Sequence, residues 1–336
     1  MIRAMMVLSA LVACTGPVDD QLNVKTADGV VLPVMVRGEL DARGTLVVYE
    51  AGGPFGGGVE ERLVDYQRFS ETLEPHVAIA YYDRRGYGNA NGRYRPEDIT
   101  VDGLMSDLDD VLAVVRERYD PDSLVLMGHS FGGFATANYL VTHPEAEIDA
   151  WVSSAGAVLT GGDAAYVPYR FAFACRVAAD RLDTEDPLWA EIDAWCATDP
   201  QVDPEDWEQA ERRTLSGYLD AIYERAGDPP LRFGRLVGAV FGSSYNVTDV
   251  LLTANRISGP ISDETRELDL LSELDAVDVP TLLVTGELDD IVPTEVAVDV
   301  AAVLPDANLV EVEAGAHYPT WPDPQPFADA VLNFFP

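Results

Sequence analysis

The chain has 336 residues, of which 47% are hydrophobic, and it carries a formal net charge of −36. A chain of this length and apolar content buries a large core, which excludes a wholly disordered protein. The negative charge repels phosphate backbones and anionic membrane surfaces, so nucleic acid is excluded as a partner.

The first residues look like a bacterial export signal. Arg3 precedes an apolar run over residues 4–13 that is too short to span a bilayer but suits the core of a signal peptide. Small residues stand directly before Cys14, as in a bacterial lipobox. We therefore expect a signal peptide over residues 1–13, a lipid on Cys14 and a tether over residues 14–21. This predicts an exported, membrane-anchored lipoprotein on the periplasmic or extracellular side that meets the membrane only through its lipid. An ordinary signal peptide or a wrongly assigned start codon is the alternative.

Buried strands and amphipathic helices alternate along most of the chain. Thr45–Tyr49 reads as a strand, and a glycine-rich loop over residues 50–58 follows it. In residues 101–119, apolar residues recur at helical spacing and form one buried face. Short parallel strands interleaved with such helices predict an α/β fold with a doubly wound, mostly parallel sheet. We assign its core to residues 22–159 and 274–336.

A strand, a Gly-x-Ser-x-Gly sequence and a helix follow one another at residues 123–140. Gly128 and Gly132 flank Ser130, and this order is typical of the nucleophile elbow of serine hydrolases. The glycines allow two backbones to pass closely where a Cβ would clash. The N–H of Phe131, in the first helical turn, would then point to a developing oxyanion.

The loop after the predicted third strand is expected to supply a second oxyanion donor. We assign this role to Gly53, with Gly52 as the neighbouring alternative. A phosphate-binding loop is the rival interpretation, but no lysine follows these glycines as that motif requires.

The stretch over residues 160–273 interrupts the alternation and is rich in predicted helix. It is far longer than an ordinary connection, so we expect an inserted helical cap that roofs the carboxyl edge of the sheet and shapes the substrate pocket. The cap contains Cys175 and Cys196. Because exported proteins often form disulfides, we hypothesise a bridge between these two cysteines.

The last part of the chain offers an acid and a base. A predicted strand over residues 280–285 leads to two adjacent aspartates, of which we prefer Asp289 to Asp290. Of the four histidines, His129 lies inside the elbow, and His76 and His143 fit surface or helix-end positions. His317 follows the last predicted strand, so it would lie at the same sheet edge as Ser130. The order Ser130, Asp289, His317 is the one expected for a Ser-Asp-His triad.

The chain from about Leu22 to Phe335 resembles an α/β-hydrolase, and its N-terminal half resembles the proline iminopeptidase branch. The likeness is carried by the Gly-Gly-Pro sequence at residues 52–54, the Asp-Arg-Arg-Gly-Tyr-Gly sequence at residues 83–88 and the elbow. It implies that Gly53 and Phe131 form the oxyanion hole and that Asp83 and Arg85 brace the loops around it. Ala51 departs from the family pattern, which has a histidine there.

These features predict a serine hydrolase that acts by acyl transfer and needs no cofactor or metal. The expected substrate is a small molecule or short peptide with a free N-terminus, as for a proline iminopeptidase. A carboxylic-ester hydrolase is the alternative. A lipoprotein that keeps this fold only as a binding scaffold is a further hypothesis, which the intact triad sequence disfavours.

Overall fold

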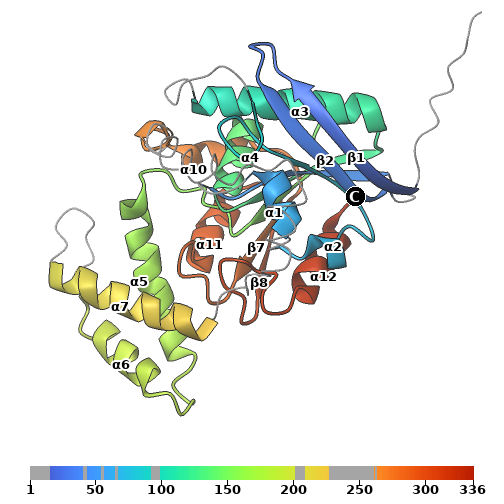
Figure 1. Ribbon diagram of the computed structural model, residues 1–336. Helices are drawn as coiled ribbons and strands as arrows, with labels where there is room; N and C mark the ends of the chain where they lie inside the picture. Colours follow the sequence, from blue (N-terminus) through green and yellow to red (C-terminus); the bar gives the residue numbers. More distant parts are fainter. Residues whose placement is uncertain are drawn as a thin grey trace, which may run out of the picture.

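A single sheet of eight strands runs through the molecule (Figure 1). The computed structural model describes residues 16–40, 44–53, 57–64, 67–91, 99–200, 209–226, 261 and 263–336. The strand order is β1-β2-β4-β3-β5-β6-β7-β8; β2 runs antiparallel to its neighbours β1 and β4, and the other neighbouring strands are parallel. The predicted doubly wound, mostly parallel sheet is confirmed. The strands are β1 (Gly16–Lys25), β2 (Val31–Leu40), β3 (Thr45–Glu50), β4 (Ala78–Tyr82), β5 (Ser123–His129), β6 (Ala150–Ser154), β7 (Thr281–Gly286) and β8 (Ala307–Val312).

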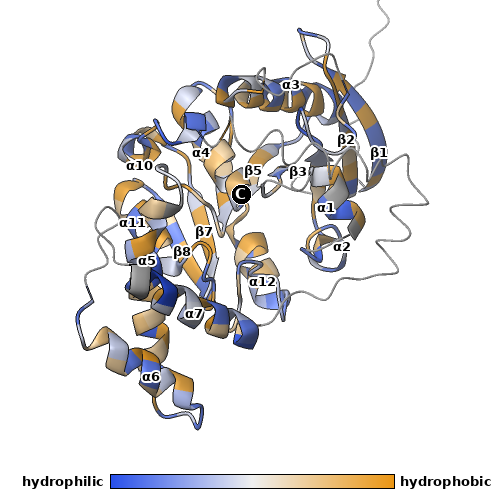
Figure 2. Ribbon diagram, turned by 60° about the vertical axis from the view of Figure 1, so that its left-hand side comes forward, coloured by the Kyte–Doolittle hydropathy of each residue, from blue (hydrophilic) through white to orange (hydrophobic). Residues whose placement is uncertain are grey.

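Helices cover both faces of this sheet, so its strands are apolar on both sides (Figure 2). In β3, for example, Leu46 and Val48 belong to one buried cluster, whereas Val47 and Tyr49 belong to the other. This alternation follows from the two-residue period of a strand. The first cluster lies against α3 (Val101–Tyr119), α4 (Phe131–Thr142), α10 (Leu270–Glu273) and α11 (Thr294–Val303). The second lies against α2 (Phe69–Thr72) and α12 (Gln325–Phe334).

The N-terminal boundary differs from the prediction. Residues 16–21, predicted as a tether, lie in β1, which pairs with β2 from Gly16 opposite Leu40 to Lys25 opposite Val31. The side chains of β1 are mostly half-buried or exposed, because it is an edge strand held chiefly by its backbone ladder. The core therefore begins by Gly16 rather than at Leu22. Residues 1–13 and Cys14 lie outside the described residues.

The inserted segment forms a small helical bundle with a core of its own. Its described helices are α5 (Asp163–Ala179), α6 (Pro187–Cys196) and α7 (Gln209–Ala226). Phe173, Trp189 and Ile192 are buried at their centre, together with Leu288 from the loop after β7. Helix α5 also packs against α11 and forms an ion pair with it, Arg176 Nε to Glu295 Oε1 at 2.7 Å.

The C-terminal limit of the cap needs correction. Ile261 and Leu270 are buried in the first cluster of the main core, although residues 160–273 were predicted to be cap. The described cap helix α5 packs against α11 (Figure 1). Residues 201–208 and 227–260 of the predicted cap lie outside the described residues, so the roof over the sheet edge stays a prediction. In the described part of the chain, none of the helices combines the length and apolar character that crossing a membrane requires.

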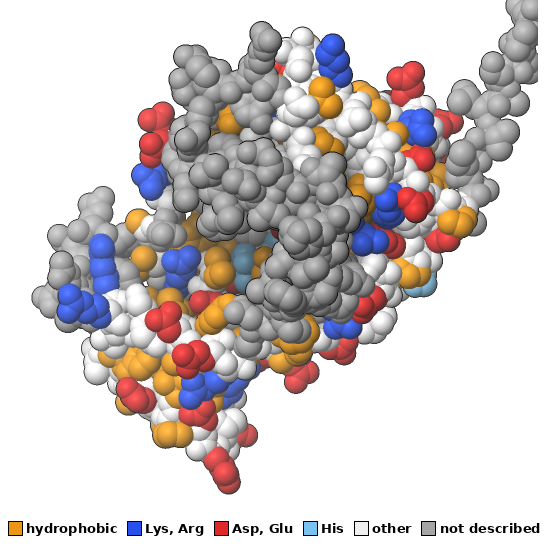
Figure 3. Space-filling model, viewed as in Figure 1, with side chains coloured by type: hydrophobic (Ala, Val, Ile, Leu, Met, Phe, Trp, Pro, Cys, Tyr) orange, Lys and Arg blue, Asp and Glu red, His pale blue; other side chains and the backbone are white. Residues whose placement is uncertain are grey.

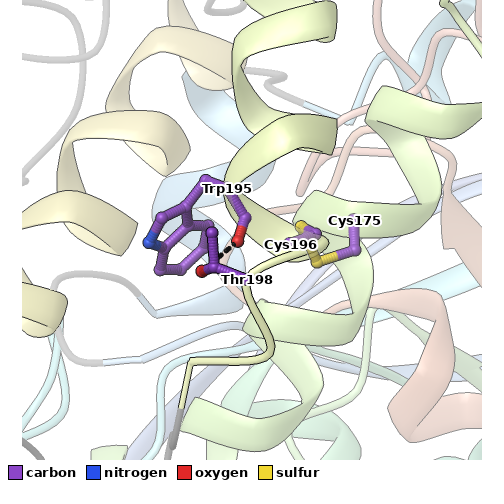
Figure 4. The surroundings of a disulfide bond; sticks show 4 residues. All are labelled: Cys175, Trp195, Cys196 and Thr198. Carbon is purple, nitrogen blue, oxygen red and sulfur yellow. Dashed lines mark hydrogen bonds between the residues drawn. A yellow bond between two sulfur atoms is a disulfide. The ribbon is translucent and has the colours of Figure 1, made fainter.

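A disulfide joins Cys175 of α5 to the last residue of α6, Cys196 (Figure 4). The Cα atoms of the two residues are 5.9 Å apart. The bridge hypothesised from the sequence is thus present in the structure. The disulfide covalently links α5 and α6, two of the helices that form the cap core.

We expect reduction of this bridge to lower the free energy of unfolding by about 3 kcal/mol, because it closes a loop of 21 residues in the unfolded chain. Denaturant titration with and without reductant measures the loss. A Cys175→Ala/Cys196→Ala variant is the control, since reductant should leave its stability unchanged. Finding both thiols reactive in the denatured, unreduced protein would contradict the bridge.

Candidate active site

Ser130 occupies the sharp turn between β5 and α4. Its backbone lies at φ 52° and ψ −118°, a conformation that L-residues rarely adopt and that costs on the order of 1–3 kcal/mol. A Cβ on Gly128 would come within 2.2 Å of the Gly132 carbonyl oxygen, and one on Gly132 within 2.1 Å of the Glu50 carbonyl oxygen. The close backbone passage predicted for the two glycines is present, and it presents the Ser130 side chain at the sheet edge.

The structure brings Ser130, His317 and Asp289 together from three separate loops. His317 Nε2 lies 2.9 Å from Ser130 Oγ, and His317 Nδ1 lies 3.0 Å from Asp289 Oδ2. Asp289 is fully buried, and its Oδ1 accepts the N–H groups of Ile291 at 3.0 Å and Val292 at 2.9 Å. These bonds fix the carboxylate, and the carboxylate in turn fixes the ring of His317.

The neighbouring aspartate does not take this place. Asp290 Oδ1 is buried and has no hydrogen-bond partner among the described residues. Burial, and secondly the charge of Asp289, raise the pKa of Asp290 to about 6. The backbone turn therefore directs the side chain of Asp289, and not that of Asp290, toward His317.

The other histidines lie outside this arrangement, as expected. His129 is buried, and its Nδ1 lies 3.1 Å from the carbonyl oxygen of Ser154. Burial, helped by nearby His317, holds the pKa of His129 well below its usual range. His143 is the C-terminal cap residue of α4, and His76 lies in the turn before β4.

Gly53 and Phe131 lie side by side next to Ser130. A Cβ on Gly53 would be 3.0 Å from the Cβ of Phe131. Phe131 is the first residue of α4, so its N–H has no acceptor within the helix. The two residues assigned to the oxyanion hole are therefore adjacent, at the positive end of the α4 dipole.

Asp83 and Arg85 hold the neighbouring loops. Asp83 accepts the backbone N–H of Val59 at 3.1 Å and that of Asn89 at 3.0 Å, which ties two loops to one buried carboxylate. Arg85 donates to both oxygens of buried Asp107, at 2.6 and 2.7 Å. The bracing implied by the family resemblance is thus visible as specific bonds.

Two further sets of charged groups were missed from the sequence. Glu61, in α1 (Gly58–Val64), receives a hydrogen bond of 2.6 Å from the Tyr49 hydroxyl. Glu50 and Arg84 form a buried ion pair of 2.6 Å directly behind Gly52 and Phe131. A glutamate is unremarkable in a chain with 58 acidic residues, so Glu61 carries no signal in the sequence. Glu50 could have been noticed because it is an acidic residue at the end of a predicted buried strand.

Carboxylates dominate the electrostatics around His317. Burial alone would lower the pKa of His317, but the charges of Asp289, Asp290 and Glu61 outweigh it and raise this pKa above its usual value. Only the neutral imidazole can accept a proton, so His317 can act as a base only as the pH rises above that pKa. Burial raises the pKa of Glu61 as well, to about 7. On the face of the molecule that Figure 3 shows, a histidine side chain is visible in a hollow.

The arrangement allows proton transfer from a serine hydroxyl to an imidazole next to two backbone donors. In the described part of the chain, no three His, Cys, Asp or Glu side chains converge as metal ligands would. Residues 52–330, which contain Gly53, Ser130, Phe131, Asp289 and His317, match the model of the alpha/beta hydrolase family. This chain belongs to that family.

Known proteins are similar to this chain over most of its length, at low sequence identity. A pimeloyl-[acyl-carrier protein] methyl ester esterase of Yersinia enterocolitica is 23% identical over 79% of this chain and 85% of its own length. A proline iminopeptidase of Thermoplasma volcanium is 21% identical over 79% of this chain and 81% of its own. The crystal structure of a hydrolase from Pseudomonas aeruginosa superposes with a TM-score of 0.58 at 22% identity, over 94% of this chain and 98% of that one. This protein is therefore an enzyme of the hydrolase class.

Proposed function

We propose that this protein is a serine hydrolase that works by acyl transfer through Ser130, His317 and Asp289. The observation that carries the proposal is the continuous hydrogen-bonded line from Ser130 Oγ through the His317 ring to buried Asp289. His317 Nε2 takes the hydroxyl proton as Ser130 Oγ bonds to a carbonyl carbon. Asp289 holds the ring and stabilises its charged form.

The carbonyl oxygen becomes an oxyanion that accepts the N–H groups of Gly53 and Phe131. When this intermediate collapses, the bond to the amine or alcohol breaks, and the leaving group takes the proton from His317. A water molecule then repeats the sequence on the acyl-enzyme, which releases a carboxylic acid and restores Ser130.

An aminopeptidase acting on small peptides is the first substrate class that we propose. Two proline iminopeptidases are among the relatives, and the third, an esterase, makes carboxylic-ester hydrolysis the second candidate. Asp290 and Glu61 place negative charge near His317, which favours a substrate with a free amine over one with a carboxylate.

Three matched substrates separate these candidates. An aminopeptidase turns over an aminoacyl-amide and loses at least tenfold in kcat/KM when its amine is acetylated. An ester hydrolase prefers a short acyl ester and is indifferent to the blocked amine. If none of the three is turned over and a fluorophosphonate fails to label Ser130, the protein is not an acyl-transfer hydrolase and a binding role gains support.

We further propose that the protein is exported and anchored through a lipid on Cys14, with no nucleic-acid partner. The apolar leader and the residues before Cys14 support this location, and so does the disulfide in the cap, since such bridges persist in oxidising compartments. Incorporation of labelled palmitate by the full-length chain, lost in Cys14→Ser, is the expected result. Unchanged incorporation in that variant would rule the anchor out.

A further inference from the structure

Gly52 is held at both ends by charged side chains. Its carbonyl oxygen accepts a hydrogen bond of 2.8 Å from Arg84 Nη2, and its N–H lies near the carboxylate of Glu61. Gly52 lies just after β3 and directly before Gly53, the second donor of the proposed oxyanion hole. The two charged groups therefore act on the loop at the residue next to the one that would meet the substrate.

Peptide geometry links these contacts to the direction of the Gly53 N–H. The carbonyl of Gly52 and the N–H of Gly53 belong to the same planar, trans peptide group and point in opposite directions. A guanidinium that fixes the carbonyl on one side thereby aims the N–H on the other. The Glu61 carboxylate attracts the N–H of the preceding peptide, so rotation about Gly52, which has no Cβ to restrict it, is opposed from both sides.

Arg84 is itself rigidly placed. Its Nη1 lies 2.6 Å from Glu50 Oε1, and the two side chains are 2% and 4% exposed. The Tyr82 hydroxyl donates to the same carboxylate. The guanidinium carbon lies 5.0 Å from the ring centre of Phe131, so Arg84 contacts one proposed oxyanion donor residue, Phe131, and the residue before the other, Gly52.

Glu61 is supported in a similar way. The Tyr49 hydroxyl donates to Glu61 Oε2 at 2.6 Å, and Gln67 Nε2 donates to the same hydroxyl at 3.3 Å. A Cβ on Gly52 would lie 3.7 Å from Glu61 Oε1 and 3.5 Å from Ser130 Cβ, which places the carboxyl group beside the elbow.

We propose that Arg84 and Glu61 are positioning residues that clamp Gly52 and so aim the Gly53 N–H into the oxyanion hole. The inference rests on the proposed serine-hydrolase function and adds the groups that make its second donor effective. A buried ion pair is by itself weak support for stability, and it can be replaced by apolar residues with little loss. The bond from Arg84 to the Gly52 carbonyl, with the Glu61 carboxylate near the Gly52 N–H, distinguishes a positioning role from such a filler.

Two sets of variants test the clamp. The double variant Glu50→Leu/Arg84→Met removes the guanidinium without leaving a buried carboxylate unpaired. Glu61→Ala removes the carboxylate near the Gly52 N–H, and Glu61→Gln restores an oxygen there as an amide. Arg62→Met is the matched control, because Arg62 lies on the same helix as Glu61 and pairs with partly buried Glu74, away from Gly52.

We expect kcat to fall about 10- to 100-fold in the double variant and about tenfold in Glu61→Ala, with KM within about twofold of wild type. Loss of a whole oxyanion donor costs about 10²- to 10³-fold, and a misdirected donor should cost part of that. Affinity for a peptidyl trifluoromethyl ketone, which forms a tetrahedral adduct on Ser130, should fall in proportion to kcat. Glu61→Gln should recover most of kcat, and Arg62→Met should match wild type.

Unchanged kcat in folded variants would overturn the clamp, and so would a fall in kcat with no change in adduct affinity. If the double variant does not fold, the pair Glu61→Ala and Glu61→Gln decides the same question. The proposed function fails separately, when wild type and Ser130→Ala are equally active and equally unlabelled by a fluorophosphonate. Where no substrate is turned over, the rate of fluorophosphonate labelling of Ser130 replaces kcat, because that reaction also uses the oxyanion hole.

Discussion

Ser130→Ala should lower kcat by on the order of 10⁶-fold and abolish labelling by a fluorophosphonate probe. The hydroxyl is the group that forms the covalent bond, and the methyl of alanine leaves His317 without a proton to accept. The backbone conformation at φ 52° stays available to alanine at a similar cost, so the folded structure should survive. Steady-state hydrolysis and gel-based labelling measure the two effects.

An exposed serine provides the control for this experiment. Ser272 lies on α10, and within the described part of the chain its hydroxyl bonds only the carbonyl of Asp269, the cap residue of that helix, at 3.0 Å. Ser272→Ala should keep wild-type turnover and labelling. Labelling that persists in Ser130→Ala would show that another residue is the nucleophile and would refute the proposed mechanism.

Asp289→Asn should lower kcat by about 10⁴-fold, whereas Asp290→Asn should leave most activity in place. An amide in place of Asp289 no longer selects the His317 tautomer whose Nε2 can accept the serine proton, and its neutral form does not stabilise the imidazolium. Asp290 carries no hydrogen bond to the ring, so its effect is limited to charge. Measurement of kcat/KM against pH for both variants compares these neighbours directly.

The pH profile gives the second readout of this pair. Asp290 raises the pKa of His317, so removing its charge lowers that pKa and moves the acid limb of the profile to lower pH. Asp290 is ionised above about pH 6, so the displacement of the acid limb should be seen above that pH. An acid limb that stays in place in Asp290→Asn would contradict the assigned electrostatics. Loss of activity in Asp290→Asn as large as in Asp289→Asn would overturn the choice between them.

The arrangement of Ser130, Asp289 and His317 was predictable because local signals and one topological rule suffice for it. The glycines around Ser130 mark a strained turn, and the carboxyl ends of parallel strands place the loops after β7 and β8 near that turn. The preference for Asp289 over Asp290 also agrees with the structure, in which only Asp289 bonds the ring.

Other features depend on contacts that leave no local signal. The first residues of β1 read as a polar tether, because an edge strand held by its backbone needs few apolar side chains. Arg84 contacts Glu50 from 34 positions away, and nothing in the sequence near either residue announces that pair. Ile261 returns to the main core by packing, a boundary that helical periodicity cannot reveal.

Leu288 belongs to the core of the cap and is joined by one peptide bond to Asp289. The cap is therefore not an independent module that can be exchanged between relatives to change substrate range. A substitution that repacks Phe173 or Ile192 also displaces Leu288, and through it the carboxylate that orients His317. Changes of specificity made inside the cap core would carry a cost in turnover, whereas changes on the surface of α6 or α7 would not. Engineering of this enzyme is best confined to the outer faces of those two helices.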